Sequence, residues 1–382
     1  YDHSKAPYTK MAPLHWMFDI EIDPCNADHA YFTTGFGGWE TFNLSAGERQ
    51  GDTIVWSIAT KGVEETVPLE LYAPPTGASI VSGVGDYGGY THFDITKPVP
   101  EGMHYAPYFG NTDGVTGAWN KPDVMVRVGV IFNHLFDIPP ISYSEDGGRT
   151  WKPCANAPVE KAESGHIAVN ADASVWIWTP RGALPSFTTD KGESWNTCQG
   201  LPKNIKVIAD KVNPQRFYAV DVINKTLYTS IDAGRTFTSK PLNITLRTTE
   251  KKKRGDNRGG HDRIYAMPDR EGDLWLAAYD GLYHLNADLQ AVGAMPHVST
   301  LYAFGFGKSR IEDGYPALYI IGVVDGVYGF FRSDDSGNNW VRINDDNHQY
   351  GLVLHICGDM QEYGRVYVGT HGRGLVCGSL RQ

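Results

Sequence analysis

A short pattern recurs four times along the chain and constrains its fold more than any other feature. The pattern is Ser/Thr-x-Asp-x-Gly-x-x-aromatic, and its copies span residues 144–151, 188–195, 230–237 and 333–340. The first three aspartates follow at intervals of 44 and 42 residues, and the fourth comes 103 residues later, about two intervals further. A degenerate fifth copy is expected around Asn286 and Asp288. In a chain rich in strand-forming residues, a repeat of about forty residues is typical of the blades of a β-propeller.

Each copy follows a short apolar run, such as "PPISYS" before the first copy and "GFFRS" before the fourth. We therefore place the repeat in the hairpin between the two outer strands of a blade. The aspartate caps the turn, the glycine supplies a positive φ and the aromatic residue packs between blades. This motif is known as the Asp-box. It predicts structure rather than chemistry, because it recurs from blade to blade whereas an active site occurs once.

Other alternating or apolar runs predict the remaining strands. They are "HAYFTTGF", "DVMVRVGVI", "ASVWIWT", "RFYAVDV", "DLWLAAY", "ALYIIGVV" and "GRVYVGT". About seven blades would use the whole chain. The sequence thus predicts an all-β fold, a seven-bladed β-propeller with Asp-box repeats that forms one domain over residues 1–382. The run at 364–378 has no Asp-box after it, and we expect it to close the ring against the N-terminal strands.

Composition narrows the range of partners. The 382 residues include 34 basic and 44 acidic side chains, a net charge of −10, so nucleic acid and membrane surfaces are not expected as partners. No run of 18 apolar residues is present. The exception to the acidic balance is the charged run at 250–263, which is interpreted as a solvated loop insertion.

The five cysteines contain no Cys-x-x-Cys pair, so neither a zinc site nor any other metal or cofactor is predicted. Cys154 and Cys198 each stand three residues after an Asp-box aromatic. These equivalent positions in neighbouring blades are too far apart for a disulfide. Three Asn-x-Ser/Thr patterns and a first residue that is not methionine suggest a mature form or a fragment of a secreted or extracellular protein, periplasmic or cell-surface locations included.

A propeller binds its ligand at one end of the central channel, in loops between strands. Four glycine-rich, aromatic stretches fit that description, namely residues 32–43, 79–94, 105–122 and 343–351. Within them, exposed aromatic faces could stack on sugar rings: Trp39, Tyr87, Tyr90, Trp119 and Tyr350. For any one of these rings, packing between blades is the alternative.

The stretch "SGVGDYGGY" singles out Asp86, a carboxyl group between glycines and tyrosines with no cation nearby in sequence. Hydrolysis of a glycoside requires two carboxyl groups, one of which protonates the leaving oxygen. Asp86 is our candidate for that acid, and the alternative is an aspartate that only caps a turn. Asp94 is a weaker candidate for a second carboxylate.

At this loop the chain resembles glycoside hydrolase family 74, the xyloglucan-active endo- and oligosaccharide-specific glucanases. Residues 62–94 resemble part of the second propeller of that family, "HWMFDIEIDPCNADHAYFTTG" resembles the opening of that domain, and the runs "EGDLWLAAYDGLYHL", "RSDDSGNNWVRINDDNHQYG" and "YGRVYVGTHGRGL" resemble its closing blades in order. The resemblance covers nearly the whole chain.

The resemblance implies two propellers facing each other across a cleft and hydrolysis of β-1,4-glucosidic bonds with inversion, without a metal. It implies that Asp86 is the general acid, and that the general base comes from an N-terminal propeller that this chain does not contain. The substrate would be xyloglucan or a related polysaccharide or oligosaccharide, and the side chains lining the cleft would be Tyr87, Tyr90, His92, Trp39, Trp119, His348 and Tyr350. In the family two acidic residues usually follow the histidine, whereas here Phe93 and Asp94 follow His92. We expect the phenylalanine at this position to affect fine substrate specificity.

Three alternatives remain open. One is a carbohydrate-binding propeller without catalysis. Another is a sialidase, for which Arg127, Arg263 and Arg373 would have to clamp a carboxylate beside a tyrosine nucleophile. The last is a protein-interaction propeller of the sortilin kind.

Overall fold

The computed structural model describes residues 1–6, 16–17, 19–35, 37–59, 66–131, 138–286, 288–291 and 293–380. In these ranges the regular structure consists of antiparallel β-sheets and two short 3-10 helices, η2 (Leu44–Glu48) and η3 (Lys251–Lys253). The predicted all-β class is confirmed. The described part of the chain contains no helix long and apolar enough to span a lipid bilayer.

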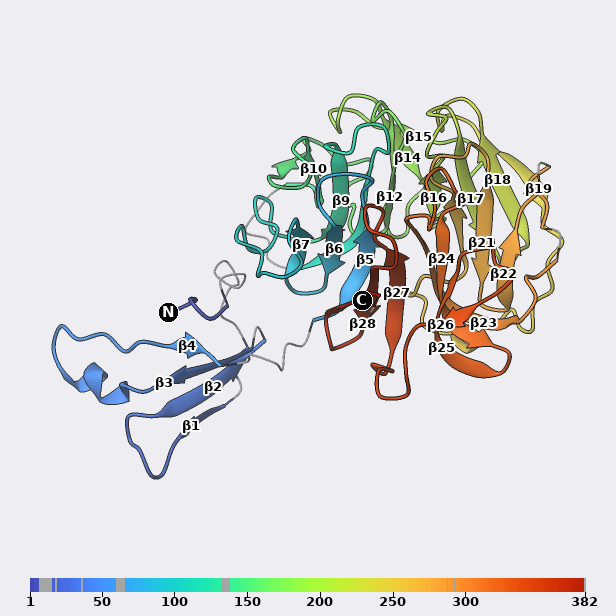
Figure 1. Cartoon of the computed structure of the whole chain (residues 1–382). Helices are drawn as coiled ribbons and strands as arrows, with labels where there is room; N and C mark the ends of the chain where they lie inside the picture. The colour runs from blue at the N-terminus through green and yellow to red at the C-terminus, as the bar shows by residue number, and fades with distance from the viewer. Residues whose placement is uncertain are drawn as a thin grey trace.

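The first sheet consists of β1 (Ile20–Ile22), β2 (Ala30–Thr34), β3 (Gly37–Thr41) and β4 (Ser57–Ile58), hydrogen-bonded in that order. It has a small core of its own, in which Phe32, Trp39 and Ile58 pack with Ala6. Figure 1 shows this blue sheet standing apart from the rest of the strands.

Seven further sheets follow, and in each of them strands consecutive in the chain pair with one another. The first three are β5 (Pro68–Tyr72), β6 (Ile80–Val84) and β7 (Gly88–His92); β8 (Asn111–Gly117), β9 (Met125–Val130), β10 (Ile141–Ser144) and β11 (Lys152–Pro153); and β12 (His166–Val169), β13 (Trp176–Thr179), β14 (Ser186–Thr188) and β15 (Asn196–Thr197). The next two are β16 (Val207–Ala209), β17 (Phe217–Asp221), β18 (Thr226–Ser230) and β19 (Thr238–Pro241), and β20 (Arg263–Ala266), β21 (Leu274–Ala278) and β22 (Gly281–His284). The last two are β23 (Val298–Gly307), β24 (Ala317–Val324), β25 (Val327–Ser333) and β26 (Val341–Arg342), and β27 (Val353–Gly358), β28 (Val366–Thr370) and β29 (Leu375–Gly378).

The seven sheets pack side by side in chain order. The first strand of each sheet contacts the next sheet, in the order β5, β8, β12, β16, β20, β23 and β27, where Tyr265 of β20 packs against Phe304 of β23, and β27 returns to contact β5. Figure 1 shows β27 and β28, in dark red, beside β5 in blue. The last sheet therefore meets β5, and not the strands β1–β4 at the N-terminus as the sequence suggested. The physical reason is that Phe32, Trp39 and Ile58 of β2–β4 already pack against each other, although Ile20 and Ile22 of β1 stay exposed.

The hydrophobic core lies between neighbouring sheets. Val126, Val128 and Ile141 of one sheet, for example, pack against Trp176 and Trp178 of the next. The strands that supply these residues are buried on both faces, which explains their near-continuous apolar runs in the sequence.

The four repeats all adopt one turn, between the third and fourth strands of their sheets. In the first copy, the Ser144 hydroxyl donates to Asp146 Oδ1 at 2.7 Å and accepts from the Gly148 amide at 2.8 Å. The Thr150 amide donates to Asp146 Oδ1 at 2.9 Å. Equivalent bonds form in the other three copies. The geometry of the repeat is local, because every one of these hydrogen bonds joins residues that are at most four positions apart in the chain.

The cysteines are free thiols in the structure. Cys154 and Cys198 are buried in two different hydrophobic clusters, one on each side of the sheet β12–β15. Burial raises the pKa of both thiols to about 12.

The charged run at 250–263 departs from its predicted solvated character at Arg254 and at its end, where His261 is 7% exposed and the Arg263 side chain 11%. Lys251, Lys252 and Lys253 are exposed, but the Arg254 side chain is only 2% exposed. Its guanidinium donates to both oxygens of Asp262, at 2.8 and 2.7 Å, and forms an ion pair with Asp280. The run is therefore anchored, because two carboxylates compensate the buried charge.

Candidate active site

The stretch "SGVGDYGGY", which contains Asp86, forms the hairpin between β6 and β7. Val84 pairs with Gly88, and Asp86 lies exposed at the tip with a φ of 63°. A side chain at Gly89, whose φ is 136°, would collide with the carbonyl oxygen of Ser82. The glycines therefore let the strands turn tightly enough to leave the aspartate projecting from the tip.

Two side chains from the following segment hold this tip. The Asp86 amide donates to Asn111 Oδ1 at 3.2 Å, and the Tyr108 hydroxyl donates to the carbonyl oxygen of Asp86. Burial, followed by the charge of Asp86, raises the pKa of Tyr108 to about 12. The tip is thus fixed from outside the hairpin, which compensates the cost of a positive φ at a residue other than glycine.

A row of rings leads away from Asp86 along β7. The ring centroids of Tyr87 and Tyr90 are 6.3 Å apart, and those of Tyr90 and His92 are 6.1 Å apart. Tyr90 and His92 line a hollow of about 330 Å³ together with Arg373. Burial lowers the pKa of His92 to about 4, so its imidazole is neutral near pH 7. The hollow therefore offers aromatic faces and hydrogen-bonding groups, the features that bind sugars.

Asp86 lies at the end of the molecule where β5, β8 and β27 begin, which we call the entry face. The Gly85 amide donates to Val67, just before β5, and the Asp86 amide contacts the first residue of β8. The loop that contains Arg373 reaches the same end, because the amide of Gly374 donates to Thr66 at 3.0 Å.

His348 and Tyr350 precede β27 and so belong to the entry face. The exposed His348 ring lies 2.6 Å from a carboxylate oxygen of Asp345. Tyr350 is half-buried and stacks on Phe330 with ring centroids 6.3 Å apart. Of this pair, His348 is the more accessible to a ligand.

Two other predicted residues are not brought to Asp86. Trp119 lies beyond the far end of β8, eight residues after Asn111, which corresponds to roughly 25 Å along a strand, and its indole donates to Asp269. Trp39 is 1% exposed in the core of the sheet β1–β4. In this conformation no sugar ring can stack on Trp39, since other aromatic rings already cover it.

Asp94 is likewise separated from Asp86 by the full length of β7. Its carboxylate accepts from the amide and hydroxyl of Thr96 and pairs with Lys97. The Thr96 hydroxyl, then Lys97, hold the pKa of Asp94 well below its usual range. Asp94 is therefore an ionised turn residue.

The three arginines considered for a sialidase clamp lie in different surroundings. Arg127 is fully buried against Phe109 and Trp151, and Arg263 pairs with Glu70. Only Arg373 lies on the entry face near Asp86. Within the described ranges, no group of three histidine, cysteine or acidic side chains is arranged to hold a metal ion.

Sequence reasoning did not single out Tyr108, Asn111 or Arg373 as parts of this site. The first two lie in the stretch 105–122, which is predicted as a loop for its glycines and aromatics but contains β8, with Asn111 as its first residue. Nothing in the local pattern of that loop indicates which of its side chains reach the hairpin at Asp86.

No family model matches the chain. Its sequence is 41% identical over 368 residues to xyloglucanase Xgh74A of Acetivibrio thermocellus, with 96% of this chain and 41% of the relative covered. It is 32% identical over 400 residues to an oligoxyloglucan-reducing end-specific xyloglucanase of Emericella nidulans, with 96% of this chain and 47% of the relative covered.

Solved structures show the same relationship. The crystal structure of a GH74 xyloglucanase from Xanthomonas campestris matches with a TM-score of 0.88 and 34% identity, and covers 100% of this chain and 52% of that chain. A GH74 enzyme from Niastella koreensis matches with a TM-score of 0.79 and 31% identity, over 96% of this chain and 50% of that chain. The chain thus spans about half the length of the relatives it matches.

These similarities confirm the resemblance that the hairpin at Asp86 and the closing strands indicated. Over nearly its whole length, the chain is homologous to one half of the xyloglucanases of glycoside hydrolase family 74.

Proposed function

We propose that the chain is the C-terminal half of a glycoside hydrolase that cleaves β-1,4-glucosidic bonds of xyloglucan or a related β-glucan. The observation that supports this most is the exposed Asp86, held by Asn111 and Tyr108 at the start of a row of aromatic rings. The two xyloglucanase relatives described above, each more than twice as long, support the substrate class.

In this proposal the sheets from β5 to β29 form a seven-bladed propeller. The sequential contacts of their first strands and the return of β27 to β5 support that reading. The sheet β1–β4 would then be an eighth sheet outside the ring, so the single domain expected for residues 1–382 would be divided near residue 60.

The chemistry assigned to Asp86 is that of the general acid. Its protonated carboxyl gives a proton to the glycosidic oxygen as the C1–O bond breaks. A second carboxylate takes a proton from a water molecule, which bonds to C1 from the opposite face and inverts its configuration. In inverting enzymes the two carboxyl groups stand about 6.5–9.5 Å apart. We assign the second carboxylate to an N-terminal propeller facing the entry face, since Asp94 lies at the other end of β7.

Substrate binding is assigned to side chains along β7 and on the entry face. Tyr87 and Tyr90 would stack on glucose rings, and His92 and Arg373 would hydrogen-bond to hydroxyl groups in the adjoining hollow. His348 and Tyr350 would contact more distant sugar units. The site requires no cofactor, and a polysaccharide substrate is consistent with a secreted protein.

The test uses the full-length gene product, with xyloglucan as substrate and reducing ends as the readout. We expect Asp86→Asn to lower kcat by about 10²–10⁴-fold, the usual contribution of a general acid, while the affinity for xyloglucan is retained. Asp94→Asn is the matched control and should stay within twofold of wild type. Equal rates for wild type and Asp86→Asn would overturn the assignment.

A non-catalytic carbohydrate-binding propeller is the second candidate. The row of rings along β7 would serve binding equally well. Xyloglucan binding by the full-length wild-type protein without any release of reducing ends would favour this candidate over hydrolysis.

A further inference from the structure

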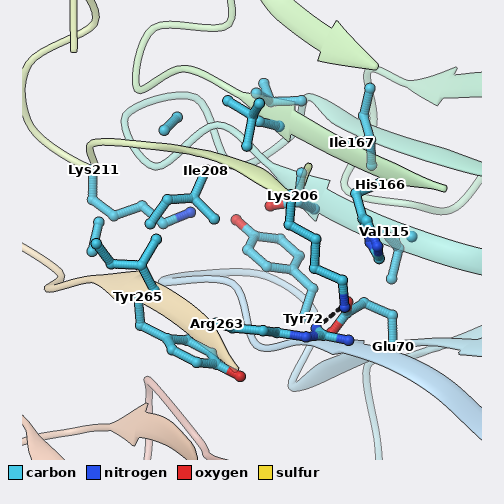
Figure 2. A pocket seen from close by; sticks show the side chains of 18 of the residues that line it. Glu70, Tyr72, Val115, His166, Ile167, Lys206, Ile208, Lys211, Arg263 and Tyr265 are labelled. Atoms are coloured by element: carbon cyan, nitrogen blue, oxygen red, sulfur yellow. Dashed lines mark hydrogen bonds and ion pairs between the residues drawn. The ribbon is translucent and has the colours of Figure 1, made fainter. Parts of the chain in front are cut away.

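A second cavity lies in the middle of the ring, and neither Asp86 nor the rings of Tyr87 and Tyr90 line it. It has a volume of about 200 Å³ and lies between the first strands β5, β8, β12, β16 and β20. Its wall is largely aliphatic, with Val115, Ile167 and Ile208 among its members. Figure 2 shows the charged side chains from three of these segments entering this apolar space.

The charges that line the cavity are unbalanced. Three basic side chains, Lys206, Lys211 and Arg263, line it together with one acidic side chain, Glu70. The only acid is already engaged, because Arg263 donates to Glu70 Oε2 at 2.8 Å. In Figure 2 the amine of Lys206 points toward this pair, whereas that of Lys211 lies at the other end of the cavity. The wall of the cavity therefore carries an excess of positive charge.

Several donors on this wall have no acceptor among the described residues. The amines of Lys206 and Lys211 make no hydrogen bond or ion pair to them; Lys211 lies 5.8 Å from the centre of the Tyr72 ring. Tyr72 is only 7% exposed, and its buried hydroxyl has no partner in the same set. Nε of Arg263 is also buried without a partner there. Buried donors are nearly always satisfied, so the buried groups of Tyr72 and Arg263 beside two half-buried lysines indicate an acceptor that fits inside this cavity.

The electrostatics agree with this geometry. Burial, and then the charge of Arg263, lower the pKa of Lys206 well below its usual value. Burial lowers the pKa of Lys211 to about 8. Burial would raise the pKa of Glu70, but the charge of Arg263, followed by those of His355 and Lys206, outweighs it and keeps the carboxylate ionised. Nearby carboxylates, Glu70, Asp262 and Asp113 for Lys206 and Asp210 for Lys211, oppose the effect of burial without cancelling it. An anion bound beside the two amines would favour their charged form further.

We propose that this central cavity binds a small monovalent anion, a halide or a one- or two-carbon carboxylate, held by Lys206 and Arg263 with Lys211 and Tyr72 at the far end. A cavity of this size holds such an ion with a few water molecules, each of which occupies about 30 Å³ in the liquid. A sugar chain does not fit there, so the site is separate from the one proposed for the polysaccharide.

Lys206 also supplies a route of entry. It lines both the central cavity and a second hollow of about 340 Å³ formed by the loops 202–206 and 251–262. That hollow is lined by Lys203, Lys251 and Arg254 and by two carboxylates, Asp221 and Asp262, of which Asp262 pairs with Arg254. Lys203 and Lys251 outnumber the remaining carboxylate, so this path would attract an anion toward Lys206.

The most direct test is a crystal of the wild-type protein soaked in sodium bromide, with data collected at the bromine absorption edge. We expect an anomalous peak in the central cavity within about 3.5 Å of Lys206 Nζ. Ordered water alone in the cavity, with no anomalous signal there at any bromide concentration tested, would overturn the proposal.

A solution test compares thermal denaturation at constant ionic strength, with sodium bromide or sodium formate replacing sodium gluconate, whose anion is too large for the cavity. Wild type should gain stability as the small anion is added, and Lys206→Met should require at least a tenfold higher anion concentration for the same gain. Lys252→Met, at an exposed lysine that lines neither hollow, is the matched control and should behave as wild type. An identical anion response of wild type and Lys206→Met would contradict the proposal.

If Lys206→Met does not fold, the bromide peak in wild type decides the question. Neither readout depends on hydrolysis, so failure here and failure of the role of Asp86 are distinguishable.

Discussion

The substitution Arg254→Met tests whether the charged loop is held by a buried ion-pair network. The Arg254 guanidinium donates to two oxygens of Asp262, to the carbonyl oxygen of Thr248 at 2.9 Å and to Asp280. The side chains of Arg254 and Asp280 are each 2% exposed, so solvent screens their attraction poorly. The substitution removes the cation and leaves both carboxylates in place.

The expected loss is about 3 kcal/mol in the free energy of unfolding. Removing one partner of a buried pair usually costs about 3–5 kcal/mol, because the other charge stays buried without compensation. The lower end applies here, since Asp280 keeps its hydrogen bond from Arg247 at 3.0 Å and Asp262 is partly exposed. Urea denaturation measures the loss from the midpoint and slope of the transition.

Lys252→Met is the matched control, because Lys252 is exposed in the same loop. A surface substitution of this kind usually changes stability by less than about 0.5 kcal/mol. Arg254→Lys should recover only part of the loss, since an ammonium group cannot reproduce the two parallel bonds to Asp262. The reasoning is refuted if Arg254→Met destabilises the protein by less than about 1 kcal/mol or no more than Lys252→Met.

Three further predictions concern the hairpin and the repeats. The folded-state pKa of His92 is about 4, below the usual 6.5 or so of an unfolded chain, so its contribution to stability is fully present above pH 6.5 and is lost as the pH falls toward 4. It should account for about 2 kcal/mol of lost stability between pH 7 and pH 5, and His92→Gln should remove that component from urea midpoints at the two values; unchanged pH dependence would contradict the burial of the imidazole. Asp146→Ala removes the acceptor of the Thr150 amide and should cost about 1–2 kcal/mol by thermal denaturation, unlike an alanine at the exposed Glu145. Tyr108→Phe removes the donor to the carbonyl oxygen of Asp86 and should lower kcat on xyloglucan by about tenfold with KM unchanged, whereas a raised KM with kcat unchanged would mean that Tyr108 contributes to substrate binding instead.

The repeats show which part of the fold was accessible from the sequence. Every hydrogen bond in a repeat joins residues two to four positions apart, as between Ser144 and Gly148. A pattern of eight residues therefore specifies the turn, and its recurrence predicts a series of similar sheets. The seven apolar runs identified in the sequence all became strands of the structure.

The candidate site was only partly accessible in this way. Asp86 stood out because glycine, tyrosine and aspartate are neighbours in the chain, and the structure places it exposed at a hairpin tip. Trp119 fitted the same compositional criterion but lies at the other end of β8. Composition does not indicate at which end of a strand a residue lies. It therefore could not distinguish the position of Asp86 from that of Trp119.

The sequence by itself determined the all-β class, the repeating hairpins and the hairpin that carries Asp86, because the interactions involved are short-range along the chain. Only the tertiary structure decided that the sheet β1–β4 stands apart, that Arg254 is buried with Asp280, and that Lys206, Arg263 and Glu70 meet in one cavity. Glu70 and Arg263 are 193 residues apart in sequence and belong to different sheets. Contacts of this kind depend on how the sheets pack together, and no local pattern of residues encodes that packing.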